Sequence, residues 1–229
     1  MGYSKATLGK YTKNVKNLEK EFKKLPLGKL KTSFSYGNTK IGKVLNVSLP
    51  AIVTCGNCTK CKELCYDIKA CIQYPGTTEA RARNKAILEK DRDEYFRRIS
   101  EKCRRRRKNL YFRWHVAGEI VDLDYFCRMV EVARENPRFL FWTYTKMYKL
   151  VNAYVDKYGR EAIPENFIIM FSEWRGVPME NPHGFPVFTV VFKGESEPEN
   201  MWKCPGNCDV CKEAHRGCIK GENTYNLEH

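Results

Sequence analysis

Two short windows of closely spaced cysteines constrain this chain more than any other feature of its sequence. Together they hold eight of the eleven cysteines. The first window contains Cys55, Cys58, Cys61 and Cys65, and the second contains Cys204, Cys208, Cys211 and Cys218. Thiolates at such spacing, on short loops that contain glycine, can converge on one metal centre. We therefore predict that these eight cysteines are metal ligands.

The composition indicates a folded protein that has no segment able to cross a membrane. The 229 residues are 42% hydrophobic and 13% aromatic, which is enough to build a core. No apolar run approaches the roughly 20 residues that span a bilayer, and the N-terminus lacks a hydrophobic signal-peptide centre. We therefore expect a cytoplasmic protein that does not bind membranes. A reducing cytoplasm favours metal-bound or redox-active cysteines over structural disulfides.

Strand and helix patterns alternate from residue 40 to residue 192. Runs rich in branched and aromatic residues predict five strands, at 40–50, 110–116, 138–145, 166–171 and 186–192. Apolar residues at helical spacing predict helices at 77–102, 123–135 and 146–158. This alternation predicts an α/β fold with mainly parallel strands and right-handed crossovers. Because five strands are too few for a closed eight-stranded barrel, we expect a partial, open β/α barrel, with a doubly wound sheet as the alternative.

The pattern divides the chain into four segments. Residues 1–33 are lysine-rich and predict a basic helix or a loosely attached arm. Residues 34–192 form the predicted barrel core with the first cysteine window, and residues 193–226 form a cysteine-rich C-terminal segment. Residues 227–229 read as the remnant of a purification tag.

The position of the first window favours an iron–sulfur cluster. It follows the first predicted strand, where a loop of a parallel β/α sheet lies over the edge at which substrates bind. A structural zinc site is the alternative, because four thiolates also satisfy tetrahedral zinc. The second window follows the last predicted strand. It can hold an auxiliary cluster or zinc, or supply ligands to the first centre, and the sequence leaves these choices open.

Polar residues after the other strands are candidates for catalysis and cofactor binding. Gly118 and Glu119 follow the second predicted strand, where glycine permits close backbone approach and the carboxylate can receive an ammonium group. We place Tyr66, directly after the first window, with them as a cofactor-binding residue. His115 and Glu173 are candidates for proton transfer. A satisfied core histidine is the favoured interpretation of His115, and an ordinary surface ion pair explains Glu173 equally well.

The net charge of +14 favours a polyanionic partner such as a nucleic acid, although a solvated lysine-rich surface gives the same balance. A run of five basic residues is the strongest candidate contact for phosphate, and a solvated helix end is its plainer interpretation. The run consists of Arg104, Arg105, Arg106, Arg107 and Lys108.

Several motifs between Phe34 and Tyr158 resemble the gene-product-eighty-eight family of phage and mobile-element proteins. The matching stretches are Gly37-Asn38-Thr39-Lys40-Ile41-Gly42, Leu49-Pro50-Ala51, Cys61-x3-Cys65-Tyr66, Phe112-Arg113-Trp114-His115-Val116-Ala117-Gly118-Glu119 and Phe141-Trp142-Thr143-Tyr144-Thr145-Lys146. This resemblance covers more than half of the chain and implies a phage-encoded protein that works in a bacterial cytoplasm. It implies no particular activity.

The layout is also distantly similar to the radical S-adenosylmethionine superfamily. That resemblance implies a 4Fe-4S cluster held by Cys55, Cys61 and Cys65, and a turn at Ala117-Gly118-Glu119 that contacts the methionine amine. The spacing departs from the family pattern, and Cys58 can close the iron position that S-adenosylmethionine needs.

Together these features predict an iron–sulfur enzyme of radical S-adenosylmethionine type that acts on a nucleotide or nucleic-acid-related substrate. The alternative is a non-catalytic nucleic-acid-binding protein stabilised by zinc or a cluster.

Overall fold

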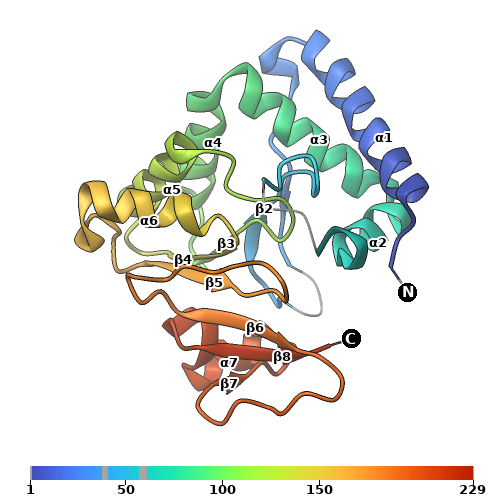
Figure 1. The fold of residues 1–229 in the computed structure, drawn as a ribbon. Coiled ribbons are helices and arrows are strands. Elements are labelled where there is room, and N and C mark those ends of the chain that lie inside the picture. Colours follow the sequence, from blue (N-terminus) through green and yellow to red (C-terminus); the bar gives the residue numbers. More distant parts are fainter. Residues whose placement is uncertain (1, 38–40, 57–60, 229) are drawn as a thin grey trace.

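The computed structural model describes residues 2–37, 41–56 and 61–228. Its centre is a mostly parallel sheet with eight strands in the described part of the chain (Figure 1). The order across the sheet is β1-β2-β3-β4-β5-β6-β8-β7, and β1 pairs with β2 antiparallel. The strands are β1 (Phe34–Ser35), β2 (Leu45–Val47), β3 (Tyr111–Trp114), β4 (Leu140–Thr145), β5 (Phe167–Ser172), β6 (Val187–Val191), β7 (Trp202–Lys203) and β8 (Thr224–Leu227).

The described residues also form seven α-helices. They are α1 (Lys5–Lys24), α2 (Tyr66–Gln73), α3 (Pro75–Lys90), α4 (Arg92–Arg104), α5 (Leu123–Glu135), α6 (Tyr148–Tyr158) and α7 (Cys208–Ala214). In Figure 1, α4, α5 and α6 lie on one side of the sheet, and α7 lies with β7 and β8 at the other end of the molecule. The helix α1 packs on α2 and α3 through buried Tyr11 and Val15, so the N-terminal segment is a packed helix rather than a loose arm.

The strands from β2 to β6 are neighbours in the order in which the chain makes them. Each of these pairs is parallel. A doubly wound sheet reverses direction at a switch point, so this order excludes the doubly wound alternative for β2 to β6. When all crossovers are right-handed and each leads to the next strand on the same side of the sheet, the connecting helices all lie on one face.

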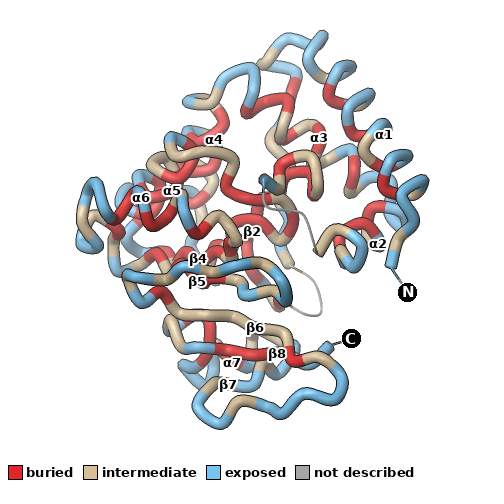
Figure 2. The backbone as a smooth tube through the Cα atoms, viewed as in Figure 1, coloured by how far each residue is buried: buried red, intermediate tan, exposed pale blue. Residues whose placement is uncertain are grey.

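Alternation along each strand builds two different interiors. On β4, Phe141 belongs to the large core beneath the helices, together with Phe112, Trp114 and Phe171. The next residue, Trp142, points to the opposite face and joins a smaller core with residues of the second cysteine window. Figure 2 shows the buried backbone concentrated in the sheet and on the inward sides of the helices.

The predicted elements from 110 to 192 correspond to β3, α5, β4, α6, β5 and β6, but other elements were missed. Among the described residues the sheet has eight strands rather than the five predicted. The three additional strands are β1 and β7, with two residues each, and β8, with four. The helix predicted at 77–102 is two helices. Asp91 interrupts it with an extended backbone, and its side chain caps α4 by accepting a hydrogen bond from the Glu94 N–H at 2.9 Å. Leu227, which was assigned to the predicted tag remnant, belongs to β8 and pairs with Val191 of β6.

Candidate functional site

The loops after β2 and β3 lock together at the carboxyl edge of the sheet. The Leu49 N–H donates to the carbonyl of Ala117 at 3.0 Å. Gly118 has a φ of +86°, and a β-carbon there would lie 2.8 Å from the Leu49 carbonyl oxygen. Only glycine combines this backbone with so close an approach. The predicted turn therefore exists, and it sits against the segment that leads into the first cysteine window.

The first cysteine window begins a few residues beyond this contact. Cys55 ends the turn after β2, Cys61 begins a short 3-10 helix, and Cys65 precedes α2. All three side chains are half-buried. Burial raises the pKa of Cys65, and the neighbouring Cys61 adds to this effect, so these two thiols lie near each other. The predicted ligand Cys58 lies outside the described residues.

Tyr66 lies beside this window with an exposed ring. Its hydroxyl donates to the carbonyl of Val116, in the segment that follows β3. The contact ties the start of α2 to the loop that carries Gly118. The cofactor-binding role of Tyr66 stays a prediction.

Glu119 is the most constrained acidic residue at this edge, with 7% of its surface exposed. One carboxylate oxygen accepts from the Ile120 N–H at 2.9 Å and from the Thr145 hydroxyl at 2.8 Å, and the other accepts from the Lys146 N–H at 2.8 Å. Burial raises its pKa, and these three donors oppose that rise. Glu119 joins the ends of β3 and β4, so an ammonium group would have to share a carboxylate that already serves three protein donors.

His115 directly follows β3 and has a φ of +54°. This left-handed conformation ends the strand alternation, so the imidazole turns to the helix-covered side on which Trp114 also lies. Its Nε2 lies 2.9 Å from the Tyr125 hydroxyl in α5. Burial, reinforced by the positive Arg113, lowers the pKa of His115 to about 3. The structure thus places this catalytic candidate in the core as a neutral ring, on the side away from the second cysteine window.

Glu173, the other catalytic candidate, is exposed just after β5. Its N–H donates to the Phe188 carbonyl at 2.8 Å, which continues the pairing with β6. Lys146, after β4, reaches the same rim, where its Nζ lies 3.0 Å from the Ser172 hydroxyl and 5.5 Å from the centre of the Trp174 ring. The ends of β4 and β5 therefore bring a lysine, a hydroxyl and an indole together.

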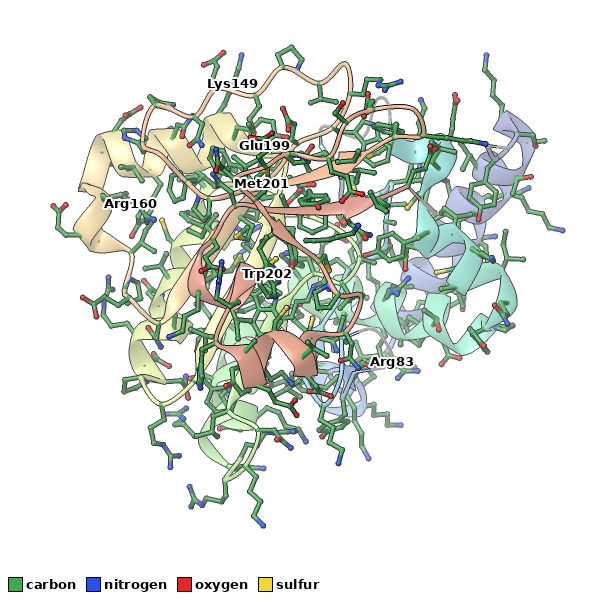
Figure 3. All side chains as sticks on the ribbon, turned by 90° about the horizontal axis from the view of Figure 1, so that it is seen from below. Arg83, Lys149, Arg160, Glu199, Met201 and Trp202 are labelled. Carbon is green, nitrogen blue, oxygen red and sulfur yellow. The ribbon has the colours of Figure 1, made fainter. Side chains whose placement is uncertain are left out.

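The second cysteine window packs on the face of the sheet opposite α4, α5 and α6, through α7 and the short 3-10 helix that follows it. Cys208 and Cys211 are on α7, and Cys218 is on the short 3-10 helix that follows. Cys211 packs in the smaller core with Trp142 and Ile219. Trp202, labelled in Figure 3, belongs to the same C-terminal segment and packs there too.

The thiols of the second window are neighbours of one another. Burial raises the pKa of Cys208, and both Cys204 and Cys211 raise it further. Burial also raises the pKa of Cys218 to about 11, with Cys204 and Cys208 again contributing. The four thiols therefore belong to one segment and influence one another electrostatically. However, no group of three or more His, Cys, Asp or Glu side chains within the described ranges is arranged to hold a metal ion.

The predicted phosphate-binding run lies at the other edge of the sheet. Arg104 ends α4, and Lys108 precedes β3, so the run sits at the amino end of that strand. Arg105 lies 3.6 Å from Glu101, and Arg106 stacks 5.3 Å from the centre of the Tyr36 ring. Arg104, Arg107 and Lys108 are exposed. The structure thus separates this run from the loops that carry the first cysteine window.

Sequence reasoning missed Arg113, which lies on β3 between the two cysteine windows. Its guanidinium stacks 4.7 Å from the centre of the Tyr144 ring, on the face opposite α4, α5 and α6. Tyr66, Cys208 and Cys218 lie close enough to raise the pKa of Arg113 electrostatically. Successive side chains of a strand point to opposite faces, so Arg113 faces away from its neighbours Phe112 and Trp114. This alternation is the signal that could have placed it here.

The family model described as gene product 88 matches residues 9–202. No curated protein and no solved structure matches the chain. The comparisons therefore support the first resemblance drawn from the sequence and give no support to the similarity to radical S-adenosylmethionine enzymes. Within the described residues, no helix is both long enough and apolar enough to cross a membrane.

Proposed function

From the premise that the chain belongs to the gene product 88 family, we propose that it is an iron–sulfur protein with its reactive centre at the carboxyl edge of the sheet. One observation carries this proposal. The loop with Cys55, Cys61 and Cys65 follows β2 and is fixed against the Gly118 turn after β3. In parallel β/α sheets this edge is where ligands bind. Thiols needed only for stability have no reason to lie there.

The strand order supports a partial barrel as the frame of this centre. Parallel strands from β2 to β6 in chain order, with helices on one face, are the arrangement from which an open β/α barrel is made. The face opposite α4, α5 and α6 would be its concave side. The second cysteine window packs against that face rather than outside it.

Cys55, Cys61 and Cys65 would hold a 4Fe-4S cluster, which supplies one-electron reduction and leaves one iron open to a small ligand such as S-adenosylmethionine. The protein's own contribution is positional. Gly118 lets the turn after β3 pack closely against Leu49 and Thr54, which lead into the cysteine loop, and Glu119 links the ends of β3 and β4. Lys146 places a cation on the same rim, which suits an anionic substrate such as a nucleotide.

Cleavage of S-adenosylmethionine tests the enzymatic part of the proposal. The reconstituted and reduced protein is expected to bind S-adenosylmethionine and to release methionine and 5′-deoxyadenosine, measured by chromatography under anaerobic conditions. The same protein without reductant is the control. If the reduced protein with a full cluster neither binds nor cleaves the compound, the radical mechanism is wrong, while the iron–sulfur assignment is still open to its own test.

A second candidate function is nucleic-acid binding without catalysis. It is favoured by the exposed basic residues on the outer face of α1, which include Lys13, Lys16 and Lys20, and by the basic run after α4. Counterion release makes such binding strongly dependent on salt. In this interpretation the cysteines hold zinc and only stabilise the fold.

Replacing Arg104, Arg105 and Arg107 by glutamine is expected to weaken binding to a DNA or RNA duplex if this second function is correct. Each lost phosphate contact should reduce the slope of log K against log salt by about 0.9. Fluorescence anisotropy at several salt concentrations measures both effects. A control variant with the same charge change replaces Lys149 and Lys157, which lie on α6, and Lys193, which follows β6. No binding by the unmodified protein even at low salt would eliminate this function.

A further inference from the structure

Tyr36, which directly follows β1, exposes 52% of its surface although two cations lie beside its ring. The Lys102 Nζ is 5.5 Å from the centre of the ring, and the Arg106 guanidinium carbon is 5.3 Å from it. The same Lys102 Nζ lies 5.7 Å from the centre of the Phe34 ring. An exposed aromatic ring therefore stands among positive charges at the amino edge of the sheet, next to the basic run.

Helix α4 holds this ring in place through residues spaced four apart. Arg98, Lys102 and Arg106 follow one another along one side of the helix and the turn that ends it. Arg98 donates to two backbone carbonyls of the segment at 27–30, and the next two cations reach Tyr36. The chain that enters β1 therefore runs along this side of α4, and the ring has a fixed position beside the start of the basic run.

The two stretches of chain that meet at this ring contain no acidic residue. No Asp or Glu occurs from residue 22 to residue 62 or from residue 102 to residue 118. The Arg106 Nε donates to two backbone carbonyls, at 2.9 and 3.2 Å, and within the described residues neither Arg106 nor Lys102 has a carboxylate partner. The positive charge here is therefore not balanced by the chain itself, and it complements an anion from outside.

We propose that Tyr36, Lys102 and Arg106 bind one base and the neighbouring phosphate of a single-stranded nucleic acid. This inference rests on the second candidate function, nucleic-acid binding, and specifies which form of nucleic acid is bound. Stacking on an aromatic side chain needs an accessible base face, which a single strand offers and a continuous duplex does not. Exposed basic residues of the adjoining run, such as Arg107, would contact the phosphates that follow.

Three tyrosine variants of the full chain test this inference. Tyr36→Ala removes the ring, and Tyr36→Phe keeps it. Tyr158→Ala is the matched control, because Tyr158 is also exposed and has the Lys157 Nζ 4.9 Å from the centre of its ring, but it ends α6. Fluorescence anisotropy at one low salt concentration measures binding to three dye-labelled probes of about 12 nucleotides per strand: oligothymidine, an abasic strand with the same phosphates, and a duplex.

Tyr36→Ala is expected to weaken binding to oligothymidine about 5- to 100-fold, the loss typical of one stacked base, and Tyr36→Phe should stay within about threefold of the unmodified protein. Binding of Tyr36→Ala to the abasic strand and to the duplex should change by less than about twofold, because only phosphates are contacted there. Tyr158→Ala should leave all three affinities unchanged.

Two results would overturn the inference and keep nucleic-acid binding. In one, Tyr36→Ala binds oligothymidine as tightly as the unmodified protein does. In the other, it loses equal affinity for oligothymidine and the abasic strand, so the ring only supports the neighbouring cations. If the unmodified protein binds none of the three probes, nucleic-acid binding and this inference fail together, while the iron–sulfur proposal is unaffected.

Discussion

Replacement of both Cys61 and Cys65 by serine is expected to remove iron from the first centre and abolish any cleavage of S-adenosylmethionine. Both thiols lie just before α2 and influence each other electrostatically. Three thiolates are the minimum that holds a 4Fe-4S cluster with one open iron, so the loss of two should release it. Hydroxyl groups are poor ligands for such clusters because sulfur provides the soft donor that iron–sulfur chemistry needs. Iron and sulfide per chain after anaerobic purification measure the loss.

The matched control for this experiment is Cys127→Ser. Cys127 is a half-buried thiol on α5 that packs against the large core, far along the chain from both windows. Its replacement should leave iron, sulfide and the visible spectrum unchanged. If the Cys61/Cys65 double variant keeps the iron content of the unmodified protein while its circular dichroism stays normal, the first window is not the site of the cluster.

Replacement of Glu119 by alanine is expected to destabilise the protein by about 3 to 5 kcal/mol, a large fraction of the roughly 5 to 15 kcal/mol typical of folded domains. The change deprives the Ile120 and Lys146 N–H groups and the Thr145 hydroxyl of their shared acceptor. Each buried donor left without a partner costs about 1 to 3 kcal/mol, which water entering the vacated space only partly offsets. Denaturant unfolding of metal-free protein isolates this effect from metal binding.

Glu119→Gln provides the comparison. Its amide oxygen can still serve Ile120 and Thr145, but its NH2 group would face the Lys146 N–H, so we expect about half of the loss seen with alanine. A loss below about 1 kcal/mol for alanine would contradict the role of Glu119 as the link between β3 and β4. In that case its carboxylate would be free for a ligand.

The periodic part of the fold could be predicted because its signals are local. The strands at Tyr111–Trp114 and Leu140–Thr145 are rich in aromatic residues, which favour strands. Helix α5 begins after a capping aspartate, Asp122, that the sequence shows directly. The short strands β1, β7 and β8 could not be predicted. β1 and β7 have only two residues each and are defined by the neighbours with which they pair, and the end of β8 was assigned to the predicted tag remnant.

The candidate site was predicted only in part, for a related reason. The spacing of cysteines is visible in the sequence, and so is the glycine that forms the turn at 118. The buried state of His115 follows from a left-handed backbone that no sequence pattern announces. Arg113 was overlooked because a charged residue on a strand is usually exposed to solvent. In the structure its guanidinium stacks on Tyr144, a ring that packs against the C-terminal segment.

The separation of the basic run from the cysteine loop follows from topology. Arg104 and Lys108 lie between α4 and β3, and a connection that enters a parallel strand is at the amino edge of the sheet. The first cysteine window leaves β2 at the carboxyl edge. Once the strands are known to be parallel, the two features have to lie at opposite edges, so a nucleic acid held by the run would not reach the proposed centre through it alone.

The most direct test of the central claim is the metal content of the protein purified without oxygen. Iron, acid-labile sulfide and zinc are measured per chain, together with the visible absorption spectrum. We predict about four irons and four sulfides for each cluster and a brown chromophore, with the iron of the first centre lost in the Cys61/Cys65 variant. A colourless protein that contains zinc and no sulfide would contradict the account, make the cysteines structural and leave nucleic-acid binding as the better-supported function.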